Sequence, residues 1–341
     1  MMDRSRKLFL FGAGASNGAR NPSPPLGSQL HGYVSGYLRQ SWSELGILEE
    51  PNDCTRTEDV RCELKQHLSD AVSYESLASK LLGAGQNDLL KKLNLLMAYT
   101  LTPPINDDPK VDDAFIEQQD IYDDFLTIKF RDSEELKTTS FITLNYDCLL
   151  ERAICRSLFK GPQHGEMQCL CKHVNCQLTD NGSGVEVLKP HGSINWVHDT
   201  SDYDKPINGK SIPIEVRIEP DGVLSWKNIT RVHSPIGHED IVIAHYVRGK
   251  KPQANPGLLE KIRERALARV QEASSIVIIG VHIPDDSSDD PFLHELLKSM
   301  KGCPVVYVSP DAGDIKRASS MHGFNTFQCG FDQYVKELKR R

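Results

Sequence analysis

"KLFLFGAGASNGARNPSPPLG" occupies residues 7–27 and begins with a short apolar run that stops at Gly12. An apolar run bounded by glycine predicts a buried strand over Lys7–Phe11. The next residues, Gly12–Ser16, place backbone amides at the carboxyl end of that strand, where glycines let an anion approach the chain closely. The stretch therefore predicts a phosphate-binding turn, with a plain tight turn as the alternative.

This turn departs from two common nucleotide motifs. The dinucleotide fingerprint has a third glycine where this chain has Asn17, and an acidic residue about 20 positions further on, where this chain has none. The Gly-Lys-Ser/Thr of a Walker loop is also absent from the turn. We therefore exclude an ordinary hydride-transfer site and a standard nucleotide triphosphatase. The Pro-rich residues 21–27 predict a lid over whatever binds.

The composition predicts an ordinary globular protein. The chain has 341 residues, enough for one large domain with an insertion or for two domains. Its net charge of -7 argues against a surface that coats nucleic acid, so we expect no direct nucleic-acid binding. No apolar run is long enough for a transmembrane helix, and the nine cysteines lack the spacing of a disulfide framework. We expect a cytoplasmic protein with reduced thiols and no membrane contact.

Further short apolar runs predict a sheet. The expected strands are Ser140–Leu144, Val185–Leu188, Ile241–Ala244, Ser275–Ile279 and Val305–Val308. Helical periodicity over Leu258–Ala273 and Pro291–Met300 gives the order helix, strand, helix, strand near the C-terminus. That order is typical of an α/β fold with a parallel, Rossmann-type sheet. We expect one domain over residues 1–341, with residues 30–131 as an inserted helical module.

Polar residues follow two of the predicted strands. Asn145 and Asp147 lie in "TLNYD", and His191 and Gly192 lie in "LKPHGSINW". Side chains at the carboxyl ends of parallel strands face the ligand crevice. Helix capping is the alternative for Asn145 and Asp147, and a structural role is the alternative for His191. In the ligand-facing interpretation His191 is a candidate general base.

The ordered combination of these motifs resembles the sirtuin-like family, which has the fold of the NAD-dependent protein deacylases. The resemblance extends from about residue 8 to residue 311 and so covers most of the chain. It implies that the Gly-Ala-Gly-x-Ser turn binds the diphosphate of NAD, which is a substrate in this family. It also implies that Asn145 and His191 are the catalytic residues. The residues implied at NAD are Gly12, Ala13, Gly14, Ala15, Ser16, Thr143, Asp147, Gly192, Gly280, His282 and Ser309.

Three departures from the deacylases favour hydrolysis of NAD over deacylation. Deacylases carry two Cys-x-x-Cys pairs after the His-Gly, whereas this chain has no cysteine from Gly192 to Gly302. Leu144 replaces the glutamine of Thr-Gln-Asn, and Gly280-Val281-His282 replaces Gly-Thr-Ser. The stretch "GVHIPDDSSDDPFLHELL" is more similar to the sirtuin-like domains of bacterial anti-phage systems, which deplete NAD.

The resemblance thus implies an NAD glycohydrolase that acts as an effector of anti-phage defence. It also implies a homo-oligomer and a regulatory protein partner, such as a ring-forming ATPase or an Argonaute-like protein. Two alternatives stay open: an NAD-dependent protein deacylase, and a non-enzymatic sensor that binds NAD or ADP-ribose.

Two polar clusters have a plain interpretation and a functional one. The Cys/His-rich loop 160–184 could hold zinc, but it has no Cys-x-x-Cys, so we expect no metal site. The residues concerned are His164, Cys169, Cys171, His173 and Cys176. The acidic run 285–290 is expected to cap the helix that begins near Pro291; the alternative is that one aspartate meets a ribose hydroxyl.

Overall fold

The computed structural model describes part of the chain. It comprises residues 6–17, 74–87, 89–90, 93–94, 97, 101, 120–130, 132–158, 174–175, 185–198, 216–218, 224–226, 240–243, 256–284 and 290–340. The chain divides into two compact units, which are described separately. The first contains residues 1–24, 109–191 and 257–341, and the second contains residues 25–108 and 192–256.

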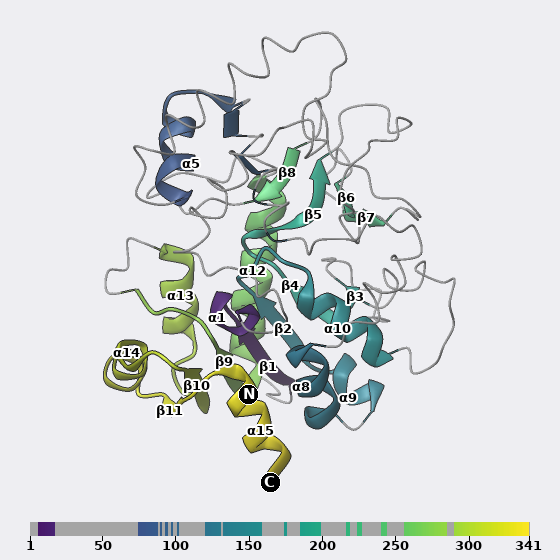
Figure 1. The fold of residues 1–341 in the computed structure, drawn as a ribbon, viewed down its shortest axis with the longest axis vertical. Helices are drawn as coiled ribbons and strands as arrows, with labels where there is room; N and C mark the ends of the chain where they lie inside the picture. The colour runs from purple at the N-terminus through teal and green to yellow at the C-terminus, as the bar shows by residue number, and fades with distance from the viewer. Residues whose placement is uncertain are drawn as a thin grey trace. The chain divides into compact units, whose positions relative to one another are not determined.

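The first unit is built on a seven-stranded sheet in the order β11-β10-β9-β1-β2-β4-β3 (Figure 1). All neighbouring strands in it run parallel. The strands are β1 (Arg6–Phe11), β2 (Ser140–Thr143), β3 (Val174–Asn175), β4 (Val185–Leu188), β9 (Ala273–Ile279), β10 (Val305–Ser309) and β11 (Asn325–Gln328). The predicted α/β fold with a parallel sheet is therefore confirmed.

The strand order explains where a ligand crevice lies. Apart from the two-residue β3, the order corresponds to the doubly wound Rossmann arrangement, which reverses direction beside the first strand. Here the chain goes from β1 to β2 on one side and later returns to β9 on the other side of β1. Ligands bind beyond the carboxyl ends of the strands at such a reversal. The segments after β1, β2, β4, β9 and β10 all leave the sheet at this carboxyl edge.

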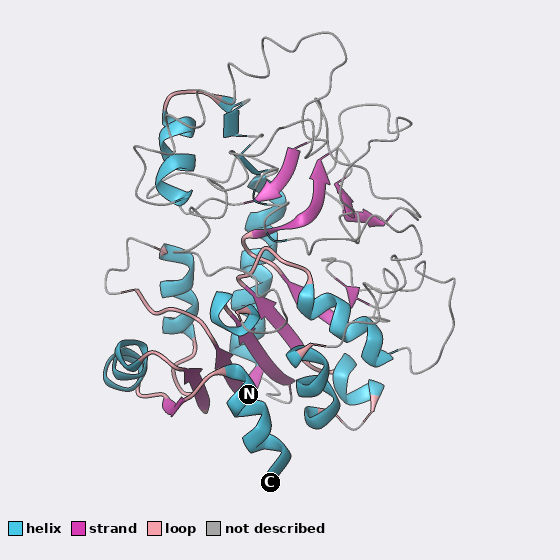
Figure 2. Ribbon diagram, in the orientation of Figure 1, coloured by secondary structure: helices cyan, strands magenta, loops and turns pink. Residues whose placement is uncertain are grey.

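Helices connect the strands of this unit (Figure 2). They are α1 (Ala13–Ser16), α8 (Ile121–Lys129), α9 (Ser133–Lys137), α10 (Leu149–Leu158), α12 (Pro256–Glu272), α13 (Pro291–Ser299), α14 (Ala312–His322) and α15 (Phe331–Arg340). Local sequence sets several helix ends. Asp290 caps α13, with Pro291 at the first helical position, and Gly323 ends α14 at a φ of 70°. The expected capping by the acidic run is thus confirmed at Asp290.

One face of the sheet is covered by an aromatic cluster. Alternate residues of β1, Phe9 and Phe11, point to the same face, and the ring of Phe125 from α8 packs edge-on against both. Phe331 of α15 packs on Phe11 at a centroid distance of 5.9 Å. The cluster fixes α8, which carries Tyr122, against the strand that leads into the glycine turn.

The second unit contains α5 (Tyr74–Gly83) and a four-stranded sheet in the order β7-β6-β5-β8. Its strands are β5 (Gly192–His198), β6 (Val216–Ile218), β7 (Leu224–Trp226) and β8 (Asp240–Ile243). The strand predicted at Ile241–Ala244 is thus present but belongs to this smaller sheet. The helical module at residues 30–131 and the single domain over residues 1–341 stay predictions. No helix within the described ranges is long and apolar enough to cross a membrane.

Candidate functional site

The glycine turn after β1 meets the end of β9 at very close range. The Gly12 amide donates to the Ile279 carbonyl at 3.0 Å, and the Gly14 amide donates to the Gly280 carbonyl at 2.9 Å. Gly280 has a φ of 63°, and a Cβ there would lie 2.2 Å from the backbone nitrogen of Ala15. Each of the two turns therefore needs glycine at its point of contact for the two strand ends to meet.

This contact corrects one expectation about the turn. The amides of Gly12 and Gly14 are bonded to β9 and its turn, and the Ala15 amide donates to the Gly12 carbonyl at 2.9 Å. These three groups are therefore not the bare amides that the glycine pattern predicts. A diphosphate here would take its hydrogen bonds from other groups of the turn or from the segment after it. The lid predicted at residues 21–27 lies outside the described residues.

Asn145 lies directly beside the turn. Its side-chain amide donates to the Gly12 carbonyl at 3.0 Å and to the Ser16 hydroxyl at 2.8 Å. The side chain is buried, and its Oδ1 accepts no hydrogen bond from any described residue. Because a buried acceptor without a donor is costly, the oxygen is set to receive a donor from a ligand or water.

His191 follows β4 and reaches the same strand end. Its Nδ1 lies 3.1 Å from the carbonyl oxygen of Leu144, the residue before Asn145. Because a carbonyl only accepts, Nδ1 carries the hydrogen and Nε2 carries the lone pair. Burial, and then the positive charge of Arg263, lower the pKa of His191 well below its usual value. His191 is therefore neutral at pH 7, with the lone pair of the ring on Nε2.

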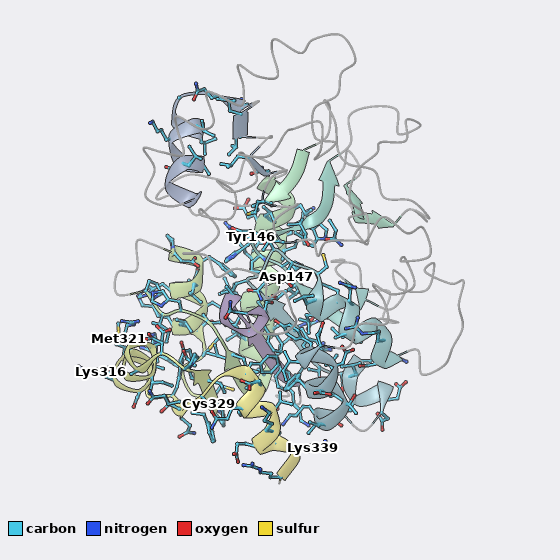
Figure 3. The ribbon with its side chains drawn as sticks, in the orientation of Figure 1. Tyr146, Asp147, Lys316, Met321, Cys329 and Lys339 are labelled. Atoms are coloured by element: carbon cyan, nitrogen blue, oxygen red, sulfur yellow. The ribbon has the colours of Figure 1, made fainter. Side chains whose placement is uncertain are left out.

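A buried lysine holds the loops after β2 and β4 together. Lys189 is fully buried; its Nζ donates to Glu151 of α10 at 2.7 Å and to the backbone carbonyl of Asp147. The Asp147 side chain accepts from the Leu149 amide at 3.0 Å and so caps the start of α10. Figure 3 labels Asp147 and Tyr146 at this end of the sheet. The capping interpretation of Asp147 is what the structure shows, and its contact with a ligand stays a prediction.

The other predicted residues are distributed along the same edge and beyond it. Thr143 ends β2, and its hydroxyl accepts from the backbone amide of Asn145 at 3.2 Å. Ser309 ends β10, and its hydroxyl accepts from the Asp311 amide at 3.2 Å. His282 follows β9 with an exposed side chain, and its Nδ1 lies 2.9 Å from Asp314. Gly192 begins β5 with a φ of 82° and belongs to the second unit.

The structure adds residues that the motifs did not indicate. The Tyr122 hydroxyl lies 3.0 Å from the Ser16 hydroxyl, so a buried chain of hydrogen bonds runs from α8 to Asn145. Asp290 brings a carboxylate oxygen to 4.0 Å from His191 Nε2. The acidic run and its helix-capping pattern were visible in the sequence. Which of its aspartates faces the histidine depends on the packing of α13 and could not be seen there.

No group of three or more His, Cys, Asp or Glu within the described part of the chain is arranged to hold a metal ion. The Cys/His cluster at residues 164–176 is not tested by this finding. His164, Cys169, Cys171, His173 and Cys176 lie outside the described residues.

Comparison with known proteins gives likenesses of the fold only. A scan of protein-family models finds no match, and a search of curated proteins finds no relative. Among solved structures, a Sir2 homologue in complex with ADP-ribose has 15% identity and a TM-score of 0.42, over 98% of this chain and 91% of that chain. A second Sir2 homologue, in complex with NAD, has 16% identity and a TM-score of 0.40, over 98% of this chain and 88% of that chain. At these values the likeness assigns neither a family nor a ligand to this chain.

Proposed function

We propose that this protein is an NAD glycohydrolase, which cleaves the bond between nicotinamide and ribose. The observation that carries the proposal is that Asn145, with its unmet Oδ1, and the neutral His191, which bonds to the neighbouring Leu144 carbonyl, lie at the same edge of the sheet. Both side chains are buried, and both follow parallel strands, β2 and β4, on the same side of β1. The sequence motifs that resemble the sirtuin-like family in order support NAD as the substrate.

The reaction needs little covalent chemistry from the protein. The electron pair of the C1′–N bond leaves with nicotinamide, and an oxocarbenium-like ribose remains. Water then attacks C1′ and gives ADP-ribose and a proton. Asn145 Oδ1 would accept a hydrogen bond from the attacking water or from a ribose hydroxyl, and so orient it. His191 Nε2 would take the proton, because its depressed pKa keeps the base unprotonated at neutral pH.

We also propose the biological role that the sequence resemblance implies. NAD hydrolysis would act as an effector of anti-phage defence by depleting the cell of NAD. Such an activity must be restrained, so we expect a homo-oligomer and a regulatory partner protein that releases it. The C-terminal stretch around residues 280–297 carries this part of the resemblance.

The test is NAD consumption by the purified full-length protein, alone and with the proteins encoded beside its gene, without any acylated peptide. We expect equal amounts of nicotinamide and ADP-ribose, and loss of both in Asn145→Ala and His191→Ala. Nicotinamide release that depends on added acyl-lysine would instead establish a deacylase. Tight NAD binding with no turnover under any condition would establish a sensor.

A further inference from the structure

A cavity lies near the amino end of β1, at the opposite edge of the sheet from the glycine turn. Its described lining consists of Lys7, Ile128, Lys129, Glu135 and Leu338. The cavity has a volume of about 540 Å³, and small-molecule sites have volumes of roughly 300–1,000 Å³. Lys7 precedes the turn by most of the extended strand β1, which places it roughly 16 Å from Gly12. The proposed NAD chemistry makes no use of this cavity.

Three helices and the start of β1 form the walls of the cavity. Lys129 ends α8, Glu135 lies on α9, and Leu338 lies on α15 (Figure 1). α15 packs against α8 through Phe331, whose ring lies 5.5 Å from that of Phe125. The aromatic cluster thus holds α8 and α15 together beside β1, and all the lining residues belong to the first unit.

The charges at the cavity do not balance. The ammonium of Lys7 donates to the Glu135 carboxylate at 2.6 Å, so these two groups neutralise each other. Within the described part of the chain the ammonium of Lys129 forms no ion pair, and it lies 6.0 Å from the centre of the Phe9 ring. That distance is the outer limit of a cation–π contact, so the ring offsets little of the charge. One positive charge is therefore left at the wall of the cavity.

The position of Lys129 is unfavourable for its charge. Burial, and then the positive charge of Lys7, lower the pKa of Lys129, whereas the charge of Glu135 acts to raise it. The side chain is half-buried, and burying a charge without a partner costs free energy. An anion that enters the cavity from solution would supply the missing partner.

We propose that this cavity binds a small organic anion, whose charged group pairs with Lys129 and whose apolar body lies against Ile128 and Leu338. Both apolar side chains are partly exposed, and the body of the ligand would remove them from water. Lysine pairs with phosphate and carboxylate as a point charge, so the recognised chemistry is an anionic group on a hydrocarbon body. A ligand at this distance from the glycine turn is an effector and not a substrate.

The test follows binding of phenyl phosphate to the full-length protein through the δ1-methyl NMR signal of Ile128. The variant Ile128→Val removes this signal and so assigns it. A local signal is needed because the probe could also bind at the glycine turn. We expect a saturable shift of the Ile128 signal.

Three further probes separate the parts of the ligand. Inorganic phosphate and the neutral benzyl alcohol should each bind about tenfold or more weakly than phenyl phosphate, because each lacks one half of the interaction. Phenylacetate carries a carboxylate in place of the phosphate, and the tighter of the two anions identifies the kind of charged group that the cavity prefers.

Variants of Lys129 test the role of its charge. Lys129→Gln should weaken phenyl phosphate binding about tenfold or more, because a charge-assisted contact is lost. Lys129→Arg keeps the charge and should bind within about threefold of the wild type. The matched control is Lys137→Gln. Lys137 lies on α9, pairs with Glu134 at 2.8 Å and is not among the lining residues, so this variant should bind as the wild type does.

Several results would overturn the site. One is an Ile128 signal that does not shift at the highest soluble concentration of phenyl phosphate. Others are equal affinities of the wild type and Lys129→Gln, or of phenyl phosphate and benzyl alcohol, because the ammonium would then play no part. A Lys129→Arg variant that binds as weakly as Lys129→Gln would also contradict pairing by charge. None of these measurements uses NAD cleavage, so their outcome is independent of the proposed function.

Discussion

At the scale of single residues, the site depends on the fixed orientation of the Asn145 amide. Its nitrogen is held by the Gly12 carbonyl and the Ser16 hydroxyl, so its oxygen must point the other way. The Ser16 hydroxyl is in turn bonded to Tyr122 on α8. A side chain whose amide nitrogen already makes two hydrogen bonds in this way loses little entropy when a ligand binds.

Tyr122→Phe tests this chain of hydrogen bonds. The ring keeps its place in the aromatic cluster, and only the bond to Ser16 is removed. We expect kcat for NAD cleavage to fall about fivefold with little change in KM, because one neutral hydrogen bond contributes about 1 kcal/mol. Steady-state kinetics would measure this. A wild-type kcat in a variant with unchanged thermal stability would show that Tyr122 does not position Asn145.

Asp290→Asn should change how the stability of the protein depends on pH. The pKa of Asp290 is raised by burial from 3.8 to about 6, so ionisation opposes folding, and the penalty develops as pH rises from about 4 to 6. Asparagine removes the penalty and keeps the cap. We expect the variant to be more stable than the wild type at pH 8, by on the order of 1–3 kcal/mol, and to lose this advantage near pH 4.

Denaturant unfolding at the two pH values would measure the difference. A variant that is less stable than the wild type at pH 8 would contradict the assignment of a buried, ionised carboxylate to Asp290.

At the scale of elements, the site is assembled by the close approach of two strand ends. Gly280→Ala tests this approach, because its Cβ would lie 2.2 Å from the Ala15 nitrogen at a φ of 63°. Gly302→Ala is the matched control, since its φ is 82° and no described atom lies within 4 Å of an added Cβ. We expect about 1–2 kcal/mol of destabilisation for the control, from backbone strain alone.

For Gly280→Ala we expect a clearly larger loss of stability and loss of NAD binding, because the two turns must separate. Chemical unfolding and calorimetry of both variants would measure these effects. Equal destabilisation of the two variants would show that the contact between the turns is not tight.

The buried Lys189–Glu151 ion pair is the second contact that joins elements around the site. Its ammonium ties α10 to the loop that carries His191, and the surrounding anions keep the pKa of Lys189 raised although burial alone would lower it. Lys189→Met should cost about 3–5 kcal/mol, because it leaves the Glu151 charge buried without its partner. The double variant with Glu151→Gln should recover much of this loss, since no unpaired charge remains. Denaturant unfolding would give the free energy of unfolding of the single and double variants. If the losses of the two single variants add up in the double variant, a direct pairing of Lys189 with Glu151 is contradicted.

The sequence predicts the strands of the large sheet well, because five of them are short apolar runs between polar or glycine residues. The predicted run at Lys7–Phe11 differs from the observed β1 by one residue, and the run at Val185–Leu188 coincides with β4. The sequence does not predict β11, "NTFQ", because this edge strand has an exposed-to-intermediate burial pattern and lacks an apolar run. The helices α14 and α15 around it were likewise not predicted.

The candidate site could be predicted in part. Asn145 and His191 follow recognisable strands, so their approach to the same edge was foreseen. Lys189 with Glu151, Tyr122 with Ser16, and Asp290 with His191 are pairs far apart in the chain, and only the packing of α8, α10 and α13 brings them together. Short-range patterns carry no information about such pairs.

At the scale of the whole molecule, the first unit alone supplies Asn145, His191 and the glycine turns. The second unit contains residues 25–108 and a later segment that starts at Gly192, immediately after the histidine. We propose that this second unit, with its part of the predicted helical module, serves self-association or contact with the regulatory partner. Deletion of residues 30–108, the part of the predicted module that belongs to the second unit, would contradict that role if it leaves assembly and activation intact.

The measurement that tests the central claim most directly is nicotinamide release from NAD by the full-length protein, comparing Asn145→Ala with Asn325→Ala. Asn325 is an exposed asparagine of β11 and serves as the matched control. We predict that Asn145→Ala lowers the rate about a hundredfold or more, whereas Asn325→Ala equals the wild type. An active wild type and an equally active, folded Asn145→Ala variant would contradict the account.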